Sequence, residues 1–254
     1  MRNRPPYLYK AYSSLNRLFQ QGRNSLLSLF FPWPCAVCGV LQAYAGVICE
    51  PCRERLPRIG NRYCRICGSP LPDQWRVRIC PECKMSRPKL TRIRSVFLYE
   101  DPLIRMIREM KFSRRARHAR YFSEELYLFL LSRMPGSIEA IVPVPLHRAR
   151  EWERTFDQAG LLAKHLQELS GLPVRNVLIR RENTIPQTSL SGRARRMNLR
   201  DAFQVKKGVQ LPSSIVLIDD VITTGATLEA CAAPLRRAGA RRVYGLTVAR
   251  AALK

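Results

Sequence analysis

Acidic residues are scarce in this chain of 254 residues, because 19 Asp and Glu stand against 44 Lys and Arg and leave a formal net charge of +25. A charge this large favours polyanionic partners such as nucleic acid, phosphorylated ligands or an anionic membrane surface. A basic surface covered only by solvent would have the same composition. Composition therefore narrows the class of partner without fixing it.

Long apolar runs are also missing. The most apolar stretch near the start, LLSLFF at 26–31, ends at Pro-Trp-Pro and is far too short to span a bilayer. The basic opening MRNRPPYLYK is not followed by the apolar run and small-residue cleavage site of a signal peptide. We therefore expect a cytoplasmic protein with no transmembrane segment, and a flexible arm over 1–25, which has five basic residues and no acidic one.

Cysteine, in contrast, is abundant: eight of the nine cysteines form four CxxC pairs. The pairs are Cys35/Cys38, Cys49/Cys52, Cys64/Cys67 and Cys80/Cys83. Each CxxC knuckle directs two thiolates at one point, and two knuckles complete a closed tetrahedral zinc site. Disulfides are rare in the cytoplasm, and iron–sulfur clusters require a different spacing. The spacing predicts a double zinc ribbon over 26–90 that binds two zinc ions.

The ribbon segment contains a repeat, since CAVCG…CEPC is echoed by CRICG…CPEC. Sequential pairing is the simplest scheme, and the spacing leaves interleaved pairing open. Gly39 and Gly68 follow the second cysteine of a knuckle, where a positive φ lets backbone amides turn back toward sulfur. We expect Cys231, which stands apart, to be a small core residue. A nucleic-acid-binding face and a purely structural cap remain equally open roles for the ribbons.

From residue 91 onward, apolar runs alternate with amphipathic patterns. The sequence predicts strands at 95–100, 139–145, 174–180, 214–219 and 241–250, and helices over 101–111, 118–133, 155–170 and 226–238. We expect Asp101 to cap the first of these helices, Pro102 to be its first residue and Gly171 to end the third. Nearly continuous apolar strands alternating with helices indicate an α/β fold with a mostly parallel sheet.

Two adjacent carboxylates, Asp219 and Asp220, follow the apolar run IVLI, and we expect them to open a loop beyond the carboxyl end of a strand, where α/β sheets bind ligands. The turn that follows contains Thr223, Thr224, Gly225 and Thr227. Free amides and hydroxyls at a helix N terminus can hold a phosphate, and the absence of GxxxxGK[ST] excludes a Walker loop. Carboxylates suit a diol or a divalent metal, so the combination suggests a phosphorylated ribose. An ordinary capped helix with an acidic turn is the alternative.

The stretch VLIDDVITTGAT resembles the phosphoribosyl-pyrophosphate (PRPP) loop of type I phosphoribosyltransferases. Four other segments precede this stretch. They are, in order, the cysteine module and then FLYEDPLIRMIREMKF, VPVPLHRAREWERTFDQAG and TIPQTSLSGRARRMNLRDAF. This order is similar to the ComF family of competence-related proteins over nearly the whole chain from about residue 26. The resemblance implies a type I phosphoribosyltransferase-like domain over 91–254 behind the double zinc ribbon. The chain departs from the family pattern RGFNQ, since RTFDQ stands at 154–158.

The resemblance also implies roles for individual residues. Asp219 and Asp220 would hold the ribose hydroxyls and would be the catalytic pair. The implied PRPP-binding residues are Asp219, Asp220, Val221, Thr223, Thr224, Gly225, Ala226 and Thr227. The implied pyrophosphate and mobile loops would supply His147, Arg148, Arg193, Arg195 and Arg196 to the diphosphate, with magnesium bridging diphosphate and ribose oxygens. Lys111 precedes a further basic patch, FSRRARHAR, which would bind phosphate or form a solvated turn.

The biological role implied by the family is natural transformation, with single-stranded DNA as a partner beside PRPP and with a competence helicase or recombination protein as a possible protein partner. Arginine clusters at 105–120 and 193–200 would follow the DNA backbone, and Phe112, Tyr121 and Phe122 would stack on bases. Two alternatives stay open: a phosphoribosyltransferase with an unknown acceptor, and a PRPP-sensing regulator with a GntX-like role in gluconate utilisation.

Overall fold

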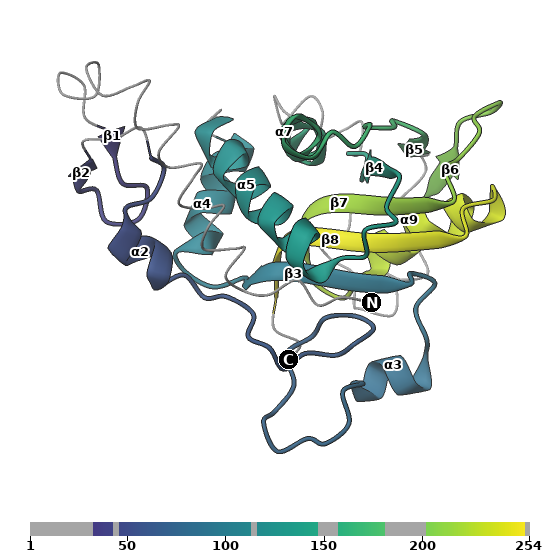
Figure 1. Cartoon of the computed structure of the whole chain (residues 1–254), viewed down its shortest axis with the longest axis horizontal. Coiled ribbons are helices and arrows are strands. Elements are labelled where there is room, and N and C mark those ends of the chain that lie inside the picture. The colour runs from purple at the N-terminus through teal and green to yellow at the C-terminus, as the bar shows by residue number, and fades with distance from the viewer. Residues whose placement is uncertain (1–32, 43–45, 113–115, 147–156, 181–201, 252–254) are drawn as a thin grey trace.

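The computed structural model describes residues 33–42, 46–112, 116–146, 157–180 and 202–251. A four-stranded sheet forms its centre (Figure 1). The strands are β3 (Arg92–Leu98), β4 (Ala140–Pro143), β7 (Ser214–Ile222) and β8 (Arg242–Arg250), in the order β3-β8-β7-β4. All three pairings are parallel, which confirms the predicted mostly parallel α/β sheet.

Helices cover both faces of this sheet. One face packs against α4 (Leu103–Phe112), α5 (Ala116–Arg133) and α7 (Gln158–Ser170), in a core that includes Val216 and Ile218 of β7. The other face packs against α9 (Ala226–Arg237) and includes Ile215 and Leu217. Successive residues of β7 thus enter opposite cores, which is why the strand reads as a continuous apolar run.

Several predicted boundaries are confirmed and others need correction. Gly171 ends α7 with a φ of 72°, and Cys231 is fully buried, both as expected. Helix α4 begins at Leu103, after a cis Asp101–Pro102 bond, and not at Pro102. The strand predicted over 174–180 is reduced to β5 (Leu178–Arg180), which pairs antiparallel with an unpredicted strand, β6 (Phe203–Val205), apart from the main sheet.

The cysteine pairs lie in two small units that precede the sheet. The first ribbon, described over 33–42 and 46–54, has a hairpin of β1 (Trp33–Pro34) and β2 (Leu41–Gln42) followed by α2 (Glu50–Glu54). The second ribbon, residues 61–85, has a single bridge between Tyr63 and Pro70, followed by α3 (Pro81–Met85). The hairpins enclose the first knuckle of each ribbon, and a helix begins at the second knuckle.

The segment between the ribbons covers the edge of the sheet at β3. The amide of Leu98 donates to the carbonyl of Pro57 at 2.7 Å, and the amide of Ile59 donates to the carbonyl of Val96 at 3.1 Å. Pairing of this kind satisfies the polar groups of an edge strand that would otherwise be open to another chain.

A buried ion pair joins the same region to α5. Glu125, only 1% exposed, accepts hydrogen bonds of 2.8 Å from both Arg53 and Arg58. Burial opposes ionisation of Glu125, but the hydrogen bonds and charges of Arg58 and Arg53 outweigh it and lower the pKa of the carboxyl. The first ribbon is therefore fixed to the α/β domain by charge as well as by apolar contact.

Candidate functional site

The acidic pair lies at the carboxyl end of β7, but inside the strand. We expected the strand to end by Asp219 and the acids to open a loop; β7 instead continues to Ile222. The reason is a long-range pairing, in which Asp219 lies opposite Thr247 and Val221 lies opposite Ala249 of β8. The carboxylates are therefore held by a strand and not by a loop, which restricts their positions.

Local hydrogen bonds orient both acids. Asp219 accepts from the amide of Asp220 at 2.8 Å, and Asp220 accepts from the amide of Val221 at 2.6 Å. Asp220 is buried and Asp219 is half-buried, so each keeps limited access to solvent. Such preorganised acceptors suit a ligand that donates hydrogen bonds from fixed positions, as a sugar diol does.

Lys111 of α4 supplies the positive charge that the buried pair requires. Its Nζ atom lies 2.7 Å from Oδ2 of Asp220, and both side chains are largely buried. From the sequence, Lys111 only precedes a basic patch that would bind phosphate or form a solvated turn. No pattern in the sequence links positions 111 and 220, since the contact arises from the packing of α4 beside the sheet.

Asp220 affects the charge of Asp219. Burial, first, and the neighbouring Asp220 charge together raise the pKa of Asp219 to about 7, although the Asp220 amide and Lys111 act in the opposite direction. A carboxyl with a pKa close to neutrality exists in both protonation states under ordinary conditions. It can therefore donate or accept a proton as well as hold a hydroxyl.

The turn after β7 leads into the N terminus of α9. Thr223 and Thr224 are exposed, and Gly225 has a φ of 82°, a conformation that favours glycine. Thr224 accepts from the amide of Ala226 at 3.3 Å, and the helix has no other side-chain cap. Exposed hydroxyls and the positive end of a helix therefore lie directly beyond the acidic pair, as a phosphate group would need.

Other predicted site residues lie outside the described part of the chain. They are His147, Arg148, Arg193, Arg195 and Arg196, together with the arm over 1–25. Asp157, the charged residue of the RTFDQ stretch, is described and caps α7 by accepting from the amide of Gly160 at 2.9 Å. The departure from RGFNQ at this position keeps a helix cap, since asparagine and aspartate cap helices about equally well.

The cysteines form two tetrads, and the pairing along the chain is sequential. Cys35, Cys38, Cys49 and Cys52 form the first tetrad, and Cys64, Cys67, Cys80 and Cys83 form the second, with the four ligand atoms of each within 4.8 Å of one another. Tetrahedral Zn–S bonds of 2.3 Å place sulfur atoms about 3.8 Å apart. The Sγ–Sγ distances of 3.7 Å for Cys38–Cys49 and 3.6 Å for Cys67–Cys80 fit zinc well.

Backbone amides point at the sulfur atoms as expected. Cys35 Sγ accepts from the amides of Val37 and Cys49 at 3.4 and 3.3 Å, and Cys64 Sγ accepts from the amide of Cys80 at 3.4 Å. Gly39 and Gly68 have φ values of 76° and 78°, which confirms the turn predicted after each knuckle. Both tetrads therefore have the donor set and the local backbone of a structural zinc site.

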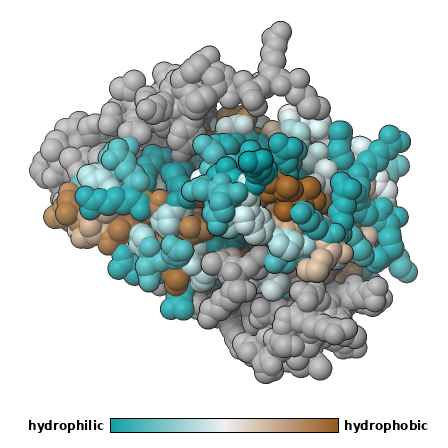
Figure 2. Space-filling model, turned by 90° about the horizontal axis from the view of Figure 1, so that it is seen from below, coloured by the Kyte–Doolittle hydropathy of each residue, from teal (hydrophilic) through white to brown (hydrophobic). Residues whose placement is uncertain are grey.

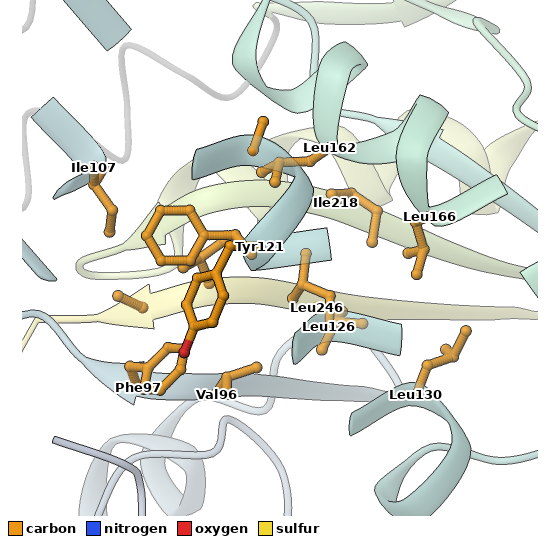
Figure 3. Packing of buried hydrophobic residues seen from close by; sticks show 14 of the residues in the cluster. Val96, Phe97, Ile107, Tyr121, Leu126, Leu130, Leu162, Leu166, Ile218 and Leu246 are labelled. Atoms are coloured by element: carbon orange, nitrogen blue, oxygen red, sulfur yellow. The ribbon is translucent and has the colours of Figure 1, made fainter. Parts of the chain in front are cut away.

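Two of the aromatics expected to stack on DNA are core residues instead. Tyr121 is 6% exposed and Phe122 is fully buried, because they lie on the side of α5 that packs on β3 and α4. Figure 3 shows Tyr121 beside Phe97, facing the interior. The prediction of base stacking on this pair was wrong, and the side chain of Phe112 lies outside the described residues.

Comparison with known proteins places the chain in a family. Residues 26–84 match the model of the double zinc ribbon domain. Competence protein F of Haemophilus influenzae is 32% identical over 233 residues, which cover 87% of this chain and 99% of that protein. The chain belongs to the ComF family. DNA utilization protein YhgH of Escherichia coli K12 is 35% identical, with 77% of this chain and 87% of the relative covered. Competence protein ComFC of Bacillus subtilis is 31% identical, with 76% and 79% covered.

The similarity of this chain to solved structures is weaker than its similarity to these relatives. A glutamine PRPP amidotransferase from B. subtilis has a TM-score of 0.35 and 22% identity, over 51% of this chain and 26% of that one. An adenine phosphoribosyl transferase from Trypanosoma brucei has a TM-score of 0.36 and 15% identity, over 55% and 67%. Within the described ranges, the protein has no helix of the length and apolarity that crossing a membrane requires.

Proposed function

We propose that this ComF-family protein binds PRPP with magnesium at the end of β7, and that it acts in natural transformation by handling incoming single-stranded DNA. PRPP binding is supported by the order of the chemical groups along the short segment that joins β7 to α9. Two fixed carboxylates, Asp219 and Asp220, are followed at once by exposed hydroxyls and a helix N terminus. The carboxylates match a diol and the helix end matches a phosphate, and one phosphorylated ribose carries both groups.

In this proposal each group has a distinct task. Asp219 and Asp220 accept hydrogen bonds from the ribose hydroxyls, and the amides and hydroxyls of 223–227 donate to the 5′-phosphate. Lys111 neutralises Asp220, so that the pair does not repel the anionic ligand with its full charge. Magnesium would arrive with the diphosphate, since this ion is held by one or two carboxylates together with substrate phosphates.

Titration calorimetry with PRPP and magnesium tests the sugar site. Wild type should bind, and Asp219→Asn should lose most of the affinity, because an amide is a poorer acceptor for a hydroxyl than a carboxylate. Asp73→Asn is the matched control, since this acid lies in the second ribbon with its side chain 95% exposed. Equal affinity in wild type and Asp219→Asn would remove this part of the proposal.

The DNA part is supported by the net charge of +25 and by the names of the relatives, which are competence and DNA utilization proteins. An exposed aromatic is also present where sequence reasoning did not look for one. Trp33 of β1 is 47% exposed, and the guanidinium of Arg117 lies 5.8 Å from the centre of its ring. An aromatic face beside a cation is a combination that single-stranded nucleic acids use for stacking and backbone contact.

The surface around Trp33 can be followed in the figures. Val40 and Leu41 of the same hairpin are exposed, and Figure 2 shows hydrophobic residues at the left end of an otherwise largely hydrophilic face, on the side where Figure 1 places the first ribbon. Binding of a fluorescent single-stranded oligonucleotide should weaken in Trp33→Ala and remain unchanged in Val40→Ala. Affinity should also fall steeply with added salt. A flat salt response, or equal binding by the two variants, would contradict the DNA role.

A second candidate function, phosphoribosyl transfer, is favoured by one observation. The pKa of Asp219, raised to about 7 by burial and by Asp220, suits proton transfer near neutrality. Release of pyrophosphate from PRPP in the presence of magnesium and amine or nucleobase acceptors is the test. Release that Asp219→Asn abolishes would establish an enzyme. Binding without release would instead leave a PRPP sensor, whose affinity for a partner should then change with PRPP.

A further inference from the structure

Two buried arginines lie against the second cysteine tetrad. Arg94 of β3 is 5% exposed and Arg250 of β8 is 2% exposed. Within the described part of the chain neither has a carboxylate partner, and the Nε atom of each has no hydrogen-bond partner. A buried guanidinium without a counter-charge is costly, so the placement of two of them against the same cysteine tetrad requires an explanation.

Both guanidinium groups point at the backbone that carries the second tetrad. Arg94 donates to the carbonyls of Arg65 at 3.0 Å and Cys64 at 3.5 Å, and its guanidinium also lies 4.7 Å from the ring centre of Tyr63. Arg250 donates to the carbonyl of Cys67 and, at 3.2 Å, to the hydroxyl of Ser69. The Ser69 hydroxyl in turn lies 3.2 Å from Cys67 Sγ, within reach to donate to a thiolate there.

The negative charge of a zinc-bound tetrad supplies the counter-charge that the two buried arginines lack. Cysteine binds zinc as thiolate, so a zinc ion with four thiolates has a net charge of minus two. Two guanidinium groups carry plus two. The buried cations and the buried metal centre therefore neutralise each other, and neither needs a carboxylate.

The first tetrad has a different environment. Cys38 is exposed, and Cys49 and Cys52 are half-buried. The arginine that contacts its first knuckle, Arg105 of α4, is itself exposed and donates to the carbonyls of Ala36 and Val37 at 3.2 and 2.7 Å. Among the described residues, Cys38 of this centre is open to solvent and no buried arginine donates to its backbone.

We propose that Arg94 and Arg250 are the counterions and positioning residues of the second zinc centre, and that they make it the slowly exchanging one of the two. The first centre exchanges its metal quickly because water and chelators reach Cys38. The second centre keeps its metal because loss of the ion would upset the charge balance around Arg94 and Arg250. The four cysteines would either take up protons, leaving the two cations unbalanced, or stay as thiolates with an excess of negative charge. Partners in the outer shell of a metal commonly change its affinity by about 10- to 100-fold.

Arg250 also links this centre to the proposed sugar site. It lies opposite Ile222, the last residue of β7, and the amide of Ala251 donates to the carbonyl of Ile222 at 2.9 Å. The turn of Thr223–Gly225 begins at the next residue. A second centre that holds zinc permanently would keep this end of the sheet fixed whether or not a sugar is bound.

The experiment is chelator-induced zinc loss from the full chain, followed by pulsed alkylation with N-ethylmaleimide and mass spectrometry, which reports each tetrad separately. In wild type the cysteines of the first tetrad should be alkylated before those of the second. Arg94→Met and Arg250→Met should accelerate alkylation of the second tetrad by about 10- to 100-fold. Arg105→Met is the matched control and should leave the second tetrad unchanged.

One further variant separates charge from packing. Arg94→Lys keeps the charge and should retain most of the slow exchange, whereas a purely packing role would leave Lys and Met equally fast. If the Met variants do not fold, the order of alkylation in wild type still tests the proposal. Alkylation of the second tetrad first or at the same rate as the first, or an unchanged rate in folded Met variants, would overturn it. Because none of these measurements involves PRPP or DNA, their outcome is independent of the proposed function.

Discussion

The Nζ atom of Lys111 lies 2.7 Å from Oδ2 of Asp220, so a lysine of α4 neutralises one of two adjacent acids at the end of β7. Neither side chain is more than 17% exposed. Lysine and aspartate in such surroundings depend on each other, because removal of one leaves a poorly solvated charge. This ion pair fixes the electrostatics of the candidate sugar site before any ligand is present.

Replacement of Lys111 by Met should lower the free energy of unfolding by about 1.5 to 3 kcal/mol, the range for a hydrogen bond that involves a charged group. Urea denaturation is the measurement. Arg108→Met, an exposed change on the same helix, is the control and should have little effect. In the double variant Lys111→Met with Asp220→Asn, part of the loss should be recovered. Strictly additive losses would show that the pair does not interact.

The raised pKa of Asp219 predicts a pH dependence of stability. Burial and Asp220 raise this pKa from 3.8 to about 7, so the folded state holds a proton that the unfolded state has released between these values. Stability from this residue is therefore present below pH 3.8 and is lost as the pH rises to about 7. Asp219→Asn should gain stability relative to wild type across this window, as followed by thermal melts. A difference that stays constant with pH would contradict the assignment.

The buried Glu125 should be a main anchor of the first ribbon. Glu125→Gln removes the buried negative charge that Arg53 and Arg58 contact at 2.8 Å, and breaking a buried pair in this way costs about 3 to 5 kcal/mol. Chemical denaturation measures the loss, and Glu124→Gln on the same helix, whose side chain is 25% exposed, is the control. Equal stability of the two variants would show that the Glu125 ion pair does not anchor the first ribbon.

The two knuckle glycines provide a matched pair. Both have a positive φ, so alanine at either position costs about 1 to 2 kcal/mol of backbone strain. A Cβ at Gly68 would also lie 2.7 Å from the carbonyl oxygen of Ile93, whereas a Cβ at Gly39 would meet nothing within 4 Å. Gly68→Ala should therefore destabilise the protein more than Gly39→Ala in thermal melts. The reverse order would mean that the second ribbon does not pack on β3 as described.

Sequence reasoning located the local features well. The CxxC spacing predicted both tetrads, and the apolar runs predicted β7 and β8, because knuckle geometry and strand burial are encoded within a few residues. Gly171 and the turn glycines were predicted for the same reason. The predicted domain boundaries at residues 25 and 90 stay predictions.

Features that depend on distant parts of the chain were missed or misplaced. Extension of β7 through the acidic pair depends on pairing with β8, and the partner of Asp220 comes from α4. Tyr121 was expected at a DNA surface because its neighbours are basic, yet α5 turns it toward Phe97. Arg94 and Arg250 lie far apart in sequence and meet at one tetrad only in the folded chain. In each case packing between elements, and not a local pattern, decides the outcome.

The most direct test of the sugar site is a crystal structure of the protein soaked with PRPP and magnesium. We predict that the two ribose hydroxyls lie within hydrogen-bond distance of Asp219 and Asp220, and that the 5′-phosphate contacts the amides of 223–227. Clear density for PRPP at any other place, or an empty turn with both carboxylates still occupied only by Lys111 and backbone amides, would contradict the account.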